Sequence, residues 1–464
     1  MQPVVARRWM WAIGGASFLC QLVVGSLTRA PSWDEAIYLS QVTRGAHALP
    51  FVASRARGIT LLEAPLTSIG APLWTVRLFL AAASALVLVV VFRVWVPVVG
   101  TGAVFGAGLF AASWPALFYG TEAMPNLWAA LLAVGAVGCF LRSELRGADA
   151  GSRHAGAGLA VLVAAMALMR PPDAIVLGLA LTVAALFLRS RLRSLLAVWL
   201  GVAAGVLPWI VEMSLRFGGP VGAVDRAAFR SHLGGQGVSL REHLAVTDGP
   251  LIGLRGSDAI PVVGAAWWIA LLALAVVAVI GRKEPTTVAA RLAAFTGFAL
   301  AGEYVFLIGG LAPRFLLPAL ALLSLAAGCG IASLSSRAWL RSRLVVAVGA
   351  LVLAAWCAWQ VGTFDRLEAS ASAERARPQA VGEAIGDHVG SSGCLVASTH
   401  DFAQVAYAAR CAGRELEDLS AGSLERLRAA SGERRIIVVS RDPSVEGLGT
   451  AVPSPVQGWV AFEL

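Results

Sequence analysis

The chain has 464 residues, of which 58% are hydrophobic and only 14% are charged, and its mean hydropathy is +0.74. Soluble domains carry about 25% charged residues, so this chain has too few to cover a surface that faces water. The net charge of +9 does not indicate nucleic-acid binding, because the arginines lie mainly in short loops between apolar runs. A soluble protein and a nucleic-acid-binding protein are therefore excluded.

Apolar runs recur along the chain at the length of about 20 residues that a helix needs to cross a bilayer. Residues 155–169 and 172–188 are short and are separated by Arg170-Pro171-Pro172-Asp173, so they form either two spans or one re-entrant pair. The first run has a basic start like a signal peptide but is too long for one, which predicts a retained span. About eleven transmembrane helices are expected, near 9–28, 73–96, 101–119, 124–141, 155–169, 172–188, 194–213, 262–281, 289–308, 315–334 and 344–362.

Arginines predict the orientation. With the N-terminus in the cytoplasm, every substantial inner connection is basic, as the positive-inside rule requires. Residues 29–72, which follow the first span, then lie on the outer side of the plasma (inner) membrane. An odd number of spans places the tail after about 363 on the same side. The basic residues of these inner connections are Arg7, Arg8, Arg142, Arg146, Arg153, Arg189, Arg191, Arg193, Arg282, Lys283, Arg337, Arg341 and Arg343.

The C-terminal tail is a different kind of sequence, which predicts a transmembrane domain at 1–362 and an extracytoplasmic α/β domain at 363–464. Strand-like runs at 394–398, 435–440 and 459–464 alternate with helical stretches near 376–389, 402–411 and 422–431. Cys394 begins the first strand and Cys411 ends the helix that follows it. On the oxidising outer side these two cysteines are expected to form a disulfide. The alternative is two separate buried thiols.

The first outer loop holds the residues best suited to chemistry. Asp34 and Glu35 follow the first span directly, and Glu63 precedes the second span, so all three acids lie at the membrane boundary. Arg55 and Arg57 lie between them. One carboxylate near an acceptor hydroxyl is a sufficient general base. A phosphate leaving group needs no general acid, only cationic stabilisation. This set suits an acceptor that attacks a substrate activated by a lipid phosphate.

The motif Trp33-Asp34-Glu35-x-x-Tyr38, followed by Glu63-Ala64-Pro65-Leu66, resembles the first periplasmic loop of family-39 glycosyltransferases. These membrane enzymes include protein O-mannosyltransferases and lipid A aminoarabinose transferases, and the resemblance implies a bacterial membrane enzyme. The resemblance spans roughly residues 9–340 and implies a GT-C fold and an inverting glycosyltransferase with a polyprenyl-phosphate sugar donor. Weaker similarities lie at 73–92 with Arg77, at 119–125, and at Arg314-Phe-Leu-Leu-Pro318.

The resemblance also implies roles for single residues. Asp34 matches the catalytic Asp, Glu35 matches its partner, and Glu63 matches the carboxylate that binds a metal ion in aminoarabinose transferases. The family's basic residue after the acidic pair is Ile37 here, and the Lys within Glu-Lys-Pro is Ala64. Donor phosphate binding must therefore use other cations, and the candidates are Arg55, Arg57, Arg170 and Arg314.

A divalent metal is a further expectation, with Glu63 joined by His232 or His243 from the long outer loop 214–260. A histidine in such a loop is more often only a surface residue. In the same way, Arg170 and Arg314 have a simpler interpretation as interfacial anchors that snorkel towards water.

Two other functions remain as alternatives. A transporter or flippase of lipid-linked substrates would place acids and helix breaks near mid-membrane, often in paired repeats. A catalytically inactive scaffold of the same fold would use the tail as its working part. The acids cluster at one face, and Asp34, Glu35 and Glu63 are all present. This favours a glycosyltransferase with a lipid, glycan or protein acceptor.

Overall fold

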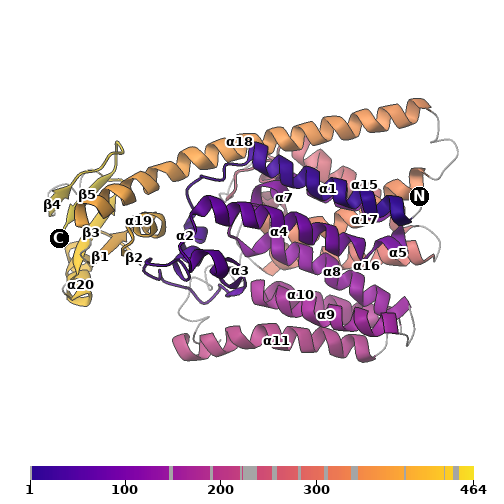
Figure 1. Cartoon of the computed structure of the whole chain (residues 1–464), viewed down its shortest axis with the longest axis horizontal. Coiled ribbons are helices and arrows are strands. Elements are labelled where there is room, and N and C mark those ends of the chain that lie inside the picture. Colours follow the sequence, from indigo (N-terminus) through magenta and orange to yellow (C-terminus); the bar gives the residue numbers. More distant parts are fainter. Residues whose placement is uncertain are drawn as a thin grey trace.

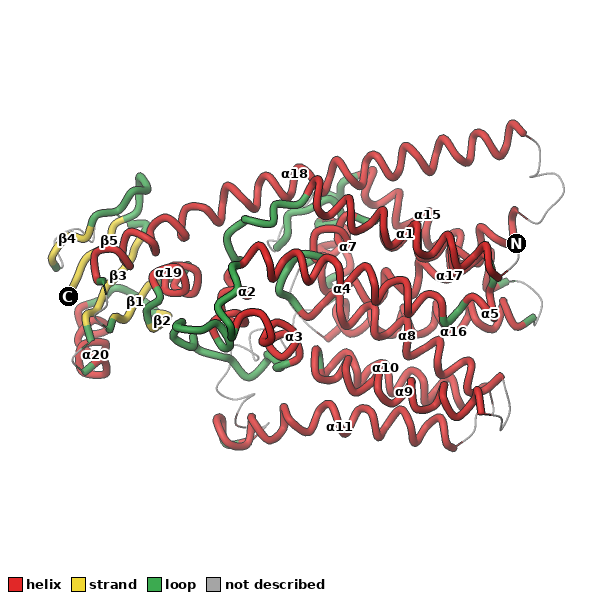
Figure 2. Tube along the Cα trace, in the orientation of Figure 1, coloured by secondary structure: helices red, strands yellow, loops and turns green. Residues whose placement is uncertain are grey.

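The computed structural model describes residues 3–145, 150–188, 192–219, 222, 238–252, 259–280, 284–307, 312–335, 343–390, 393–432, 434–442 and 449–464. Long helices run roughly along one direction, and a small sheet lies at one end of them (Figure 1). Figure 2 shows the strands gathered at that end, with loops and the short helices α2 (Trp33–Ser40) and α3 (Gly58–Thr67) between the sheet and the bundle.

Each of the eleven predicted spans coincides with helical structure. The bundle helices are α1 (Pro3–Val24), α4 (Leu73–Arg93), α6 (Thr101–Ala111) with α7 (Trp114–Tyr119), α8 (Pro125–Leu145), α9 (Ala150–Met169), α10 (Pro171–Leu188), α11 (Leu192–Phe217), α15 (Val262–Val279), α16 (Pro285–Gly302), α17 (Leu317–Ser335) and α18 (Arg343–Val389). The remaining helical pieces are α5 (Val96–Val99), α14 (Leu240–Ala245), the π-helix η1 (Glu303–Leu307) and the 3-10 helix η2 (Pro313–Leu316).

Eight helices within the described ranges are long and apolar enough to cross a membrane, and the apolar helices Thr101–Ala111 and His154–Met169 are shorter. The segments on either side of Arg170 are two separate helices, α9 and α10, of 20 and 18 residues. The chain is therefore a multi-pass membrane protein, as its composition predicts.

The centre of the bundle is formed by α8 and α17, whose apolar windows are 89% and 78% buried, against 22% for α15. α17 packs closely on α6 through glycine. A Cβ atom at Gly328 would lie 2.3 Å from the backbone nitrogen of Gly106, so only glycine permits this approach. Small residues at such crossings give the close van der Waals contact that holds helices together in lipid.

α18 is 47 residues long and runs without a break past residue 362 to Val389. At 1.5 Å per residue it is about 70 Å long, about twice the thickness of a bilayer's hydrocarbon core. In Figure 1 it runs along one side of the bundle and reaches the sheet, opposite α11. One helix therefore belongs to both the membrane part and the tail.

The sheet has five strands in the order β2-β1-β3-β5-β4. β1 is parallel to β2 and β3, whereas β5 is antiparallel to β3 and β4. Side chains alternate between the two faces. One face packs on α20 (Ala421–Ser431) and the other on α19 (Phe402–Ala409) and α18. The strands are β1 (Cys394–Ser398), β2 (Ala412–Glu415), β3 (Arg435–Ser440), β4 (Thr450–Val452) and β5 (Val460–Glu463).

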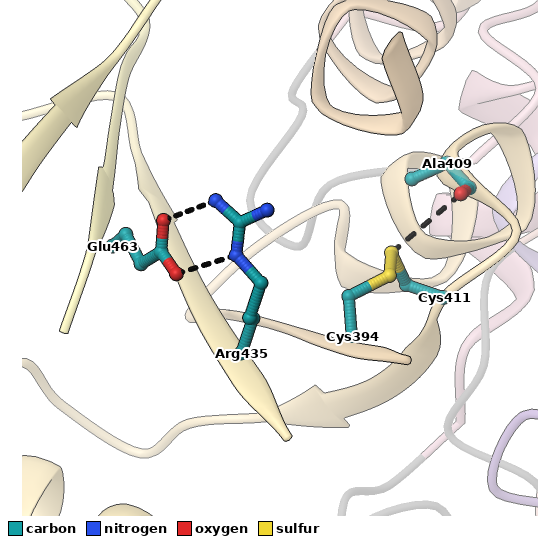
Figure 3. Close-up of a disulfide and its surroundings, with 5 residues drawn as sticks. All are labelled: Cys394, Ala409, Cys411, Arg435 and Glu463. Atoms are coloured by element: carbon teal, nitrogen blue, oxygen red, sulfur yellow. Dashed lines mark hydrogen bonds and ion pairs between the residues drawn. A yellow bond between two sulfur atoms is a disulfide. The ribbon is translucent and has the colours of Figure 1, made fainter. Parts of the chain in front are cut away.

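Two cross-links tie the sheet unit together (Figure 3). Cys394, at the start of β1, forms a disulfide with Cys411, which follows α19, and their Cα atoms are 5.0 Å apart. Arg435 on β3 donates from Nε to Oε1 of Glu463 on β5 at 2.6 Å. The disulfide therefore fixes the far end of α19 to the first strand.

Candidate active site

The acidic pair opens α2, and its capping explains why the helix begins there. The Ser32 hydroxyl accepts a hydrogen bond from the Glu35 backbone nitrogen at 3.3 Å, and the Glu35 carboxylate accepts from the Ser32 nitrogen at 2.9 Å. This capping box satisfies two backbone donors at the helix start. Successive side chains on a helix point about 100° apart. Asp34 and Glu35 therefore face different surroundings.

Glu35 points into the protein, where it is fully buried. Its carboxylate accepts hydrogen bonds from the backbone nitrogen of Ala123 at 2.9 Å, from Arg77 at 3.3 Å and from Arg375 at 3.2 Å. Arg77 lies on α4 and Arg375 on α18. Every oxygen of Glu35 is thus engaged in holding elements of the fold together.

Glu35 is one member of a larger buried set that we call the inner network. Glu122, in the turn before α8, pairs with Arg29 and with Arg375, the latter at 2.8 Å. Burial opposes ionisation of Glu122, but the surrounding guanidinium groups outweigh it and hold the pKa of that carboxyl below its usual range. Three carboxylates and three guanidinium groups make up the network: Arg29, Glu35, Arg77, Glu122, Glu368 and Arg375.

Asp34 faces the other way, into what we call the outer cluster, formed by Asp34, Arg55, Arg170 and Arg314. Its carboxylate forms an ion pair with Arg55 and accepts a hydrogen bond from Arg314 at 3.0 Å, yet its side chain stays 22% exposed. Burial raises the pKa of Asp34, but Arg55 and Arg314, with a smaller effect of Arg170, lower it below its ordinary value. Asp34 is therefore ionised at neutral pH and accessible to a ligand.

Aromatic rings hold the cations of the outer cluster. The Arg55 guanidinium lies 5.0 Å from the Trp33 ring centre and 5.6 Å from that of Tyr38. The guanidinium groups of Arg314 and Arg170 lie 5.2 Å and 5.4 Å from the ring of Phe315. Cation–π contacts of this kind fix a flexible guanidinium without neutralising its charge.

Arg170 is also anchored on its other side. Its Nε donates to Asp173 at 3.0 Å, and Tyr304 donates its hydroxyl hydrogen to the same carboxylate oxygen at 2.5 Å. The Tyr304 ring in turn stacks on Phe315, with 5.0 Å between ring centres. Asp173 therefore offsets the charge of Arg170, while Arg55 and Arg314 share the single carboxylate of Asp34.

Arg57 does not join this cluster. It forms a bidentate pair with Glu212 on α11, with nitrogen–oxygen distances of 2.6 and 3.1 Å, and donates to Gln41 at 3.0 Å. Its guanidinium lies 3.7 Å above the ring of Phe51. Arg57 thus ties the first outer loop to α11, and its hydrogen-bonding capacity is largely used.

Glu63, on α3, is fully buried, and neither of its carboxylate oxygens has a hydrogen-bond partner among the described residues. Burial raises the pKa of Glu63 well above its ordinary value, and the negative charge of Glu35 raises it further. Burial without a hydrogen-bond partner therefore disfavours the charged form of Glu63, and a cation beside it would favour that form.

The structure describes only part of the predicted metal site. Within the described ranges, no group of three or more His, Cys, Asp or Glu side chains is placed to hold a metal ion. His232 lies outside the described residues. His243 is buried, and neither ring nitrogen has a hydrogen-bond partner in the part of the chain that the structure describes. Glu63 and His232 as a metal pair remain a prediction.

A small pocket lies beside η2. Pro313 and Leu316, on either side of Arg314 in the sequence, contribute to its wall, together with His243 and Gln360. Four tryptophans also line the pocket, Trp114, Trp267, Trp268 and Trp359, and the other lining residues are Ser113, Pro115, Val246, Thr247, Gly264 and Leu320.

Comparison with solved structures establishes the fold. ArnT from Cupriavidus metallidurans bound to undecaprenyl phosphate is similar over 98% of both chains, with a TM-score of 0.68 and 13% sequence identity. Archaeal oligosaccharyltransferase AglB from Archaeoglobus fulgidus, in complex with an inhibitory peptide and a dolichol-phosphate, is similar over 93% of this chain and 69% of that one, with a TM-score of 0.57 and 12% identity. The chain has the GT-C fold. No protein-family model and no curated protein matches its sequence. The GT-C fold and the C-terminal sheet unit are confirmed as predicted.

Several residues that shape this GT-C site were not identified from the sequence. Glu122, Glu368 and Arg375 complete the inner network, and Tyr304 with Asp173 anchors Arg170. Glu122 and Asp173 are single acids close to apolar runs, and this is a signal for a functional or buried role. Glu368 and Arg375 lie in a charged stretch of sequence, which gives no such signal.

Proposed function

We propose that the protein is a membrane glycosyltransferase that moves a sugar from a polyprenyl-phosphate donor to an acceptor at the outer face of the plasma membrane. One observation carries the proposal: a partly exposed Asp34 carboxylate lies between Arg55 and Arg314 in a GT-C fold. The similar structures were solved with undecaprenyl phosphate or dolichol-phosphate bound. The carboxylate is suited to accept a proton from an acceptor hydroxyl, and the guanidinium groups beside it are suited to bind a phosphate.

In the proposed reaction Asp34 is the general base. It takes the proton from the acceptor hydroxyl as that oxygen attacks the anomeric carbon, while the bond from that carbon to the donor phosphate oxygen breaks. Arg55 and Arg314, with Arg170 nearby, stabilise the negative charge on the departing phosphate. A single displacement of this kind inverts the configuration at the anomeric carbon. Arg57 has no part in it, because it is paired with Glu212.

The pairing of Asp34 supports a link between donor binding and basicity. A phosphate that binds Arg55 and Arg314 competes with the Asp34 carboxylate for their N–H groups. Weaker pairing with cations raises the pKa of a carboxyl group. Asp34 therefore becomes a better proton acceptor when the donor is bound.

A divalent cation fits one feature of the site, the buried Glu63 carboxylate without a hydrogen-bond partner among the described residues. Glu63 is proposed to hold the cation, with His232 as a second ligand. When bound, the metal would supply positive charge beside Glu63, whose charged neighbours are Glu35 and Arg77.

The outer location is open to a labelling test. Ala48 in the first outer loop and Thr286 at the start of α16 are both exposed, and they lie on opposite sides of the membrane in the proposed orientation. Ala48→Cys should react with an impermeant thiol reagent in intact cells, whereas Thr286→Cys should react only after the membrane is permeabilised. The reverse pattern would place Asp34 on the cytoplasmic side.

The function itself is tested with the purified full-length protein. We expect transfer of label from at least one member of a panel of radiolabelled polyprenyl-phospho-sugars into membrane extract, and transfer that is about 100-fold slower, or slower still, with Asp34→Asn. Transfer from no donor, or equal transfer by Asp34→Asn, would contradict the proposal. Repeating the assay with a chelator and with Glu63→Gln tests the metal.

A further inference from the structure

The sheet unit makes direct contact with the loop that carries Asp34. The rings of Phe402, on α19, and Trp33 meet edge to face with 5.8 Å between centres. Gln404 donates to the carbonyl of Pro31 at 3.2 Å, and the Tyr407 hydroxyl lies 3.3 Å from that of Thr43. In Figure 1, α19 lies beside α2. α19 therefore contacts the loop on both sides of Asp34.

These contacts lead to the carboxylate in three steps. Phe402 is buried against Trp33, the Trp33 ring faces the Arg55 guanidinium at 5.0 Å, and Arg55 pairs with Asp34. Each contact has a preferred geometry, edge to face for the rings and face-on for the cation. The orientation of Phe402 thus bears on the position of Arg55 relative to Asp34.

We propose that α19 is a positioning element for the active site, and that Phe402 acts through Trp33 to hold Arg55 against Asp34. The kinetic part of this inference rests on the proposed function, because it takes Asp34 as the base. Phe402 is a positioning residue, since it touches neither Asp34 nor the expected substrate position.

α19 is suited to this role because it is itself held firmly. The Cys394–Cys411 disulfide fixes the end of α19 to β1. On its other side α18 packs so closely that a Cβ at Gly382 would lie 2.5 Å from the carbonyl oxygen of Val405. Because α18 also carries Arg375 to Glu35, the tail contacts both acids of the pair, Glu35 directly and Asp34 through Phe402.

The simpler alternative is that α19 only stabilises the tail by docking. Leu427 on α20 offers a matched control, because it is buried against the opposite face of the same sheet, away from the loop. Leu427→Ala weakens the sheet unit without removing any contact to Trp33. Phe402→Tyr keeps the aromatic edge and serves as the conservative variant.

Hydrogen exchange in the full-length protein tests the mechanical step without any assay of activity. Phe402→Ala should increase amide exchange in residues 33–42 by about 2- to 10-fold, as expected for loss of one aromatic pair. Phe402→Tyr and Leu427→Ala should leave this segment at the wild-type rate. Unchanged exchange in Phe402→Ala, or an equal increase in Leu427→Ala, would overturn the positioning role.

The pH dependence of turnover then tests the link to Asp34. The charged and titratable groups that face Asp34 are Arg55, Arg314, Arg170 and Tyr38. Phe402→Ala acts most directly on the first of these, because Phe402 contacts Trp33 and the Trp33 ring faces Arg55. Because Arg55 lowers the pKa of Asp34, loosening it should move the acid limb of kcat/KM to higher pH. Phe402→Tyr should restore the wild-type profile.

The two proposals fail in different ways. An unmoved acid limb in an active Phe402→Ala protein would overturn the positioning role and leave the glycosyltransferase intact. A wild-type protein that transfers no sugar would overturn the proposed function, while the exchange experiment would still decide whether Phe402 orders α2.

Discussion

Asp34 and Glu35 are neighbours in the sequence, yet they belong to two regions with opposite charge balance. The inner network has three carboxylates and three guanidinium groups, so it is neutral and closed. In the outer cluster, Arg170 is offset by Asp173, whereas Arg55 and Arg314 share Asp34 and leave one positive charge over. The balanced region needs no ligand, whereas the surplus cation of the outer cluster is where we propose that the donor phosphate binds.

The comparison also separates stability from chemistry. Breaking a buried pair leaves an uncompensated charge and is strongly destabilising. When a partly exposed carboxylate loses its charge, water can solvate the cations that it leaves behind. The penalty in stability is therefore smaller than for a buried pair. Substitutions in the inner network should therefore act on folding, and substitutions in the outer cluster on turnover.

The largest effects are expected from replacing each of the two adjacent acids, Asp34 and Glu35, by its amide. Asp34→Asn keeps the size of the side chain but cannot accept a proton, so kcat should fall by about 100-fold or more. Glu35→Gln removes a charge that faces Arg77 and Arg375, so it should lower thermal stability and the yield of folded protein. Steady-state kinetics and thermal melts of both variants check this. Wild-type turnover by Asp34→Asn would remove the mechanism.

The next largest effect is the loss of stability expected when Arg375, on α18, is removed from the inner network. Arg375→Ala leaves Glu122 and Glu35 without one of their buried partners and should cost about 3–5 kcal/mol of stability. Arg377, two residues further along and exposed, is the matched control and should cost little when replaced by Ala. Thermal unfolding in detergent measures both. Equal melting temperatures of the two variants would show that the inner network does not stabilise the fold.

A smaller loss is expected from the disulfide. Cys394→Ser removes a cross-link with a sequence separation of 17. In the chain-entropy model this is worth about 3 kcal/mol, so the tail should become sensitive to protease. Cys357→Ser, at a free cysteine on α18, is the control and should leave the tail resistant. Mass spectrometry of non-reduced peptides checks the bond itself, and two free thiols would refute it.

The smallest effects are changes in the KM for the donor, which should differ between substitutions of Arg55 and Arg57 in the first outer loop. Arg55→Ala should raise the KM for the donor by about 10-fold or more, as expected for loss of a charge-assisted hydrogen bond to phosphate. Arg57→Ala should leave this KM close to the wild-type value, because its partner is Glu212. Donor titrations of the two variants make the comparison. A larger increase for Arg57→Ala would reassign the phosphate-binding residue.

Hydropathy predicted the spans because a helix that crosses lipid must be long and apolar. Each span can be recognised from its own sequence, without knowledge of its neighbours in the fold. Three strands were predicted for a similar reason, since β1, β3 and β5 are apolar runs bounded by turn residues. β2, Ala412–Glu415, is half polar, and β4 has only three residues, so neither carries a readable pattern. Their places in the sheet depend on neighbours that only the fold brings together.

The candidate site was predictable where the motif is local. Asp34 lies next to the first span, and its position at the membrane boundary follows from topology. The partners of Glu35 could not be predicted from the sequence, because Arg77 and Arg375 lie 42 and 340 residues away from it. Arg55 and Arg57 are equivalent in the sequence, and only the position of Glu212 on α11 distinguishes them.

The contacts of α18 carry a consequence for how this chain tolerates changes in length. Gln360 accepts from the Trp114 backbone at 2.7 Å, Glu368 pairs with Arg29, and Arg375 reaches Glu122 and Glu35. These residues recur at intervals of eight and seven, close to two helical turns, so they form one stripe. A single inserted residue would rotate the rest of the stripe by about 100°, and seven would restore the rotation but displace it by about 10 Å. No insertion in this segment restores both the rotation of the stripe and its position along the helix axis. The contacts of α18 therefore fix the length of the chain between residues 360 and 375.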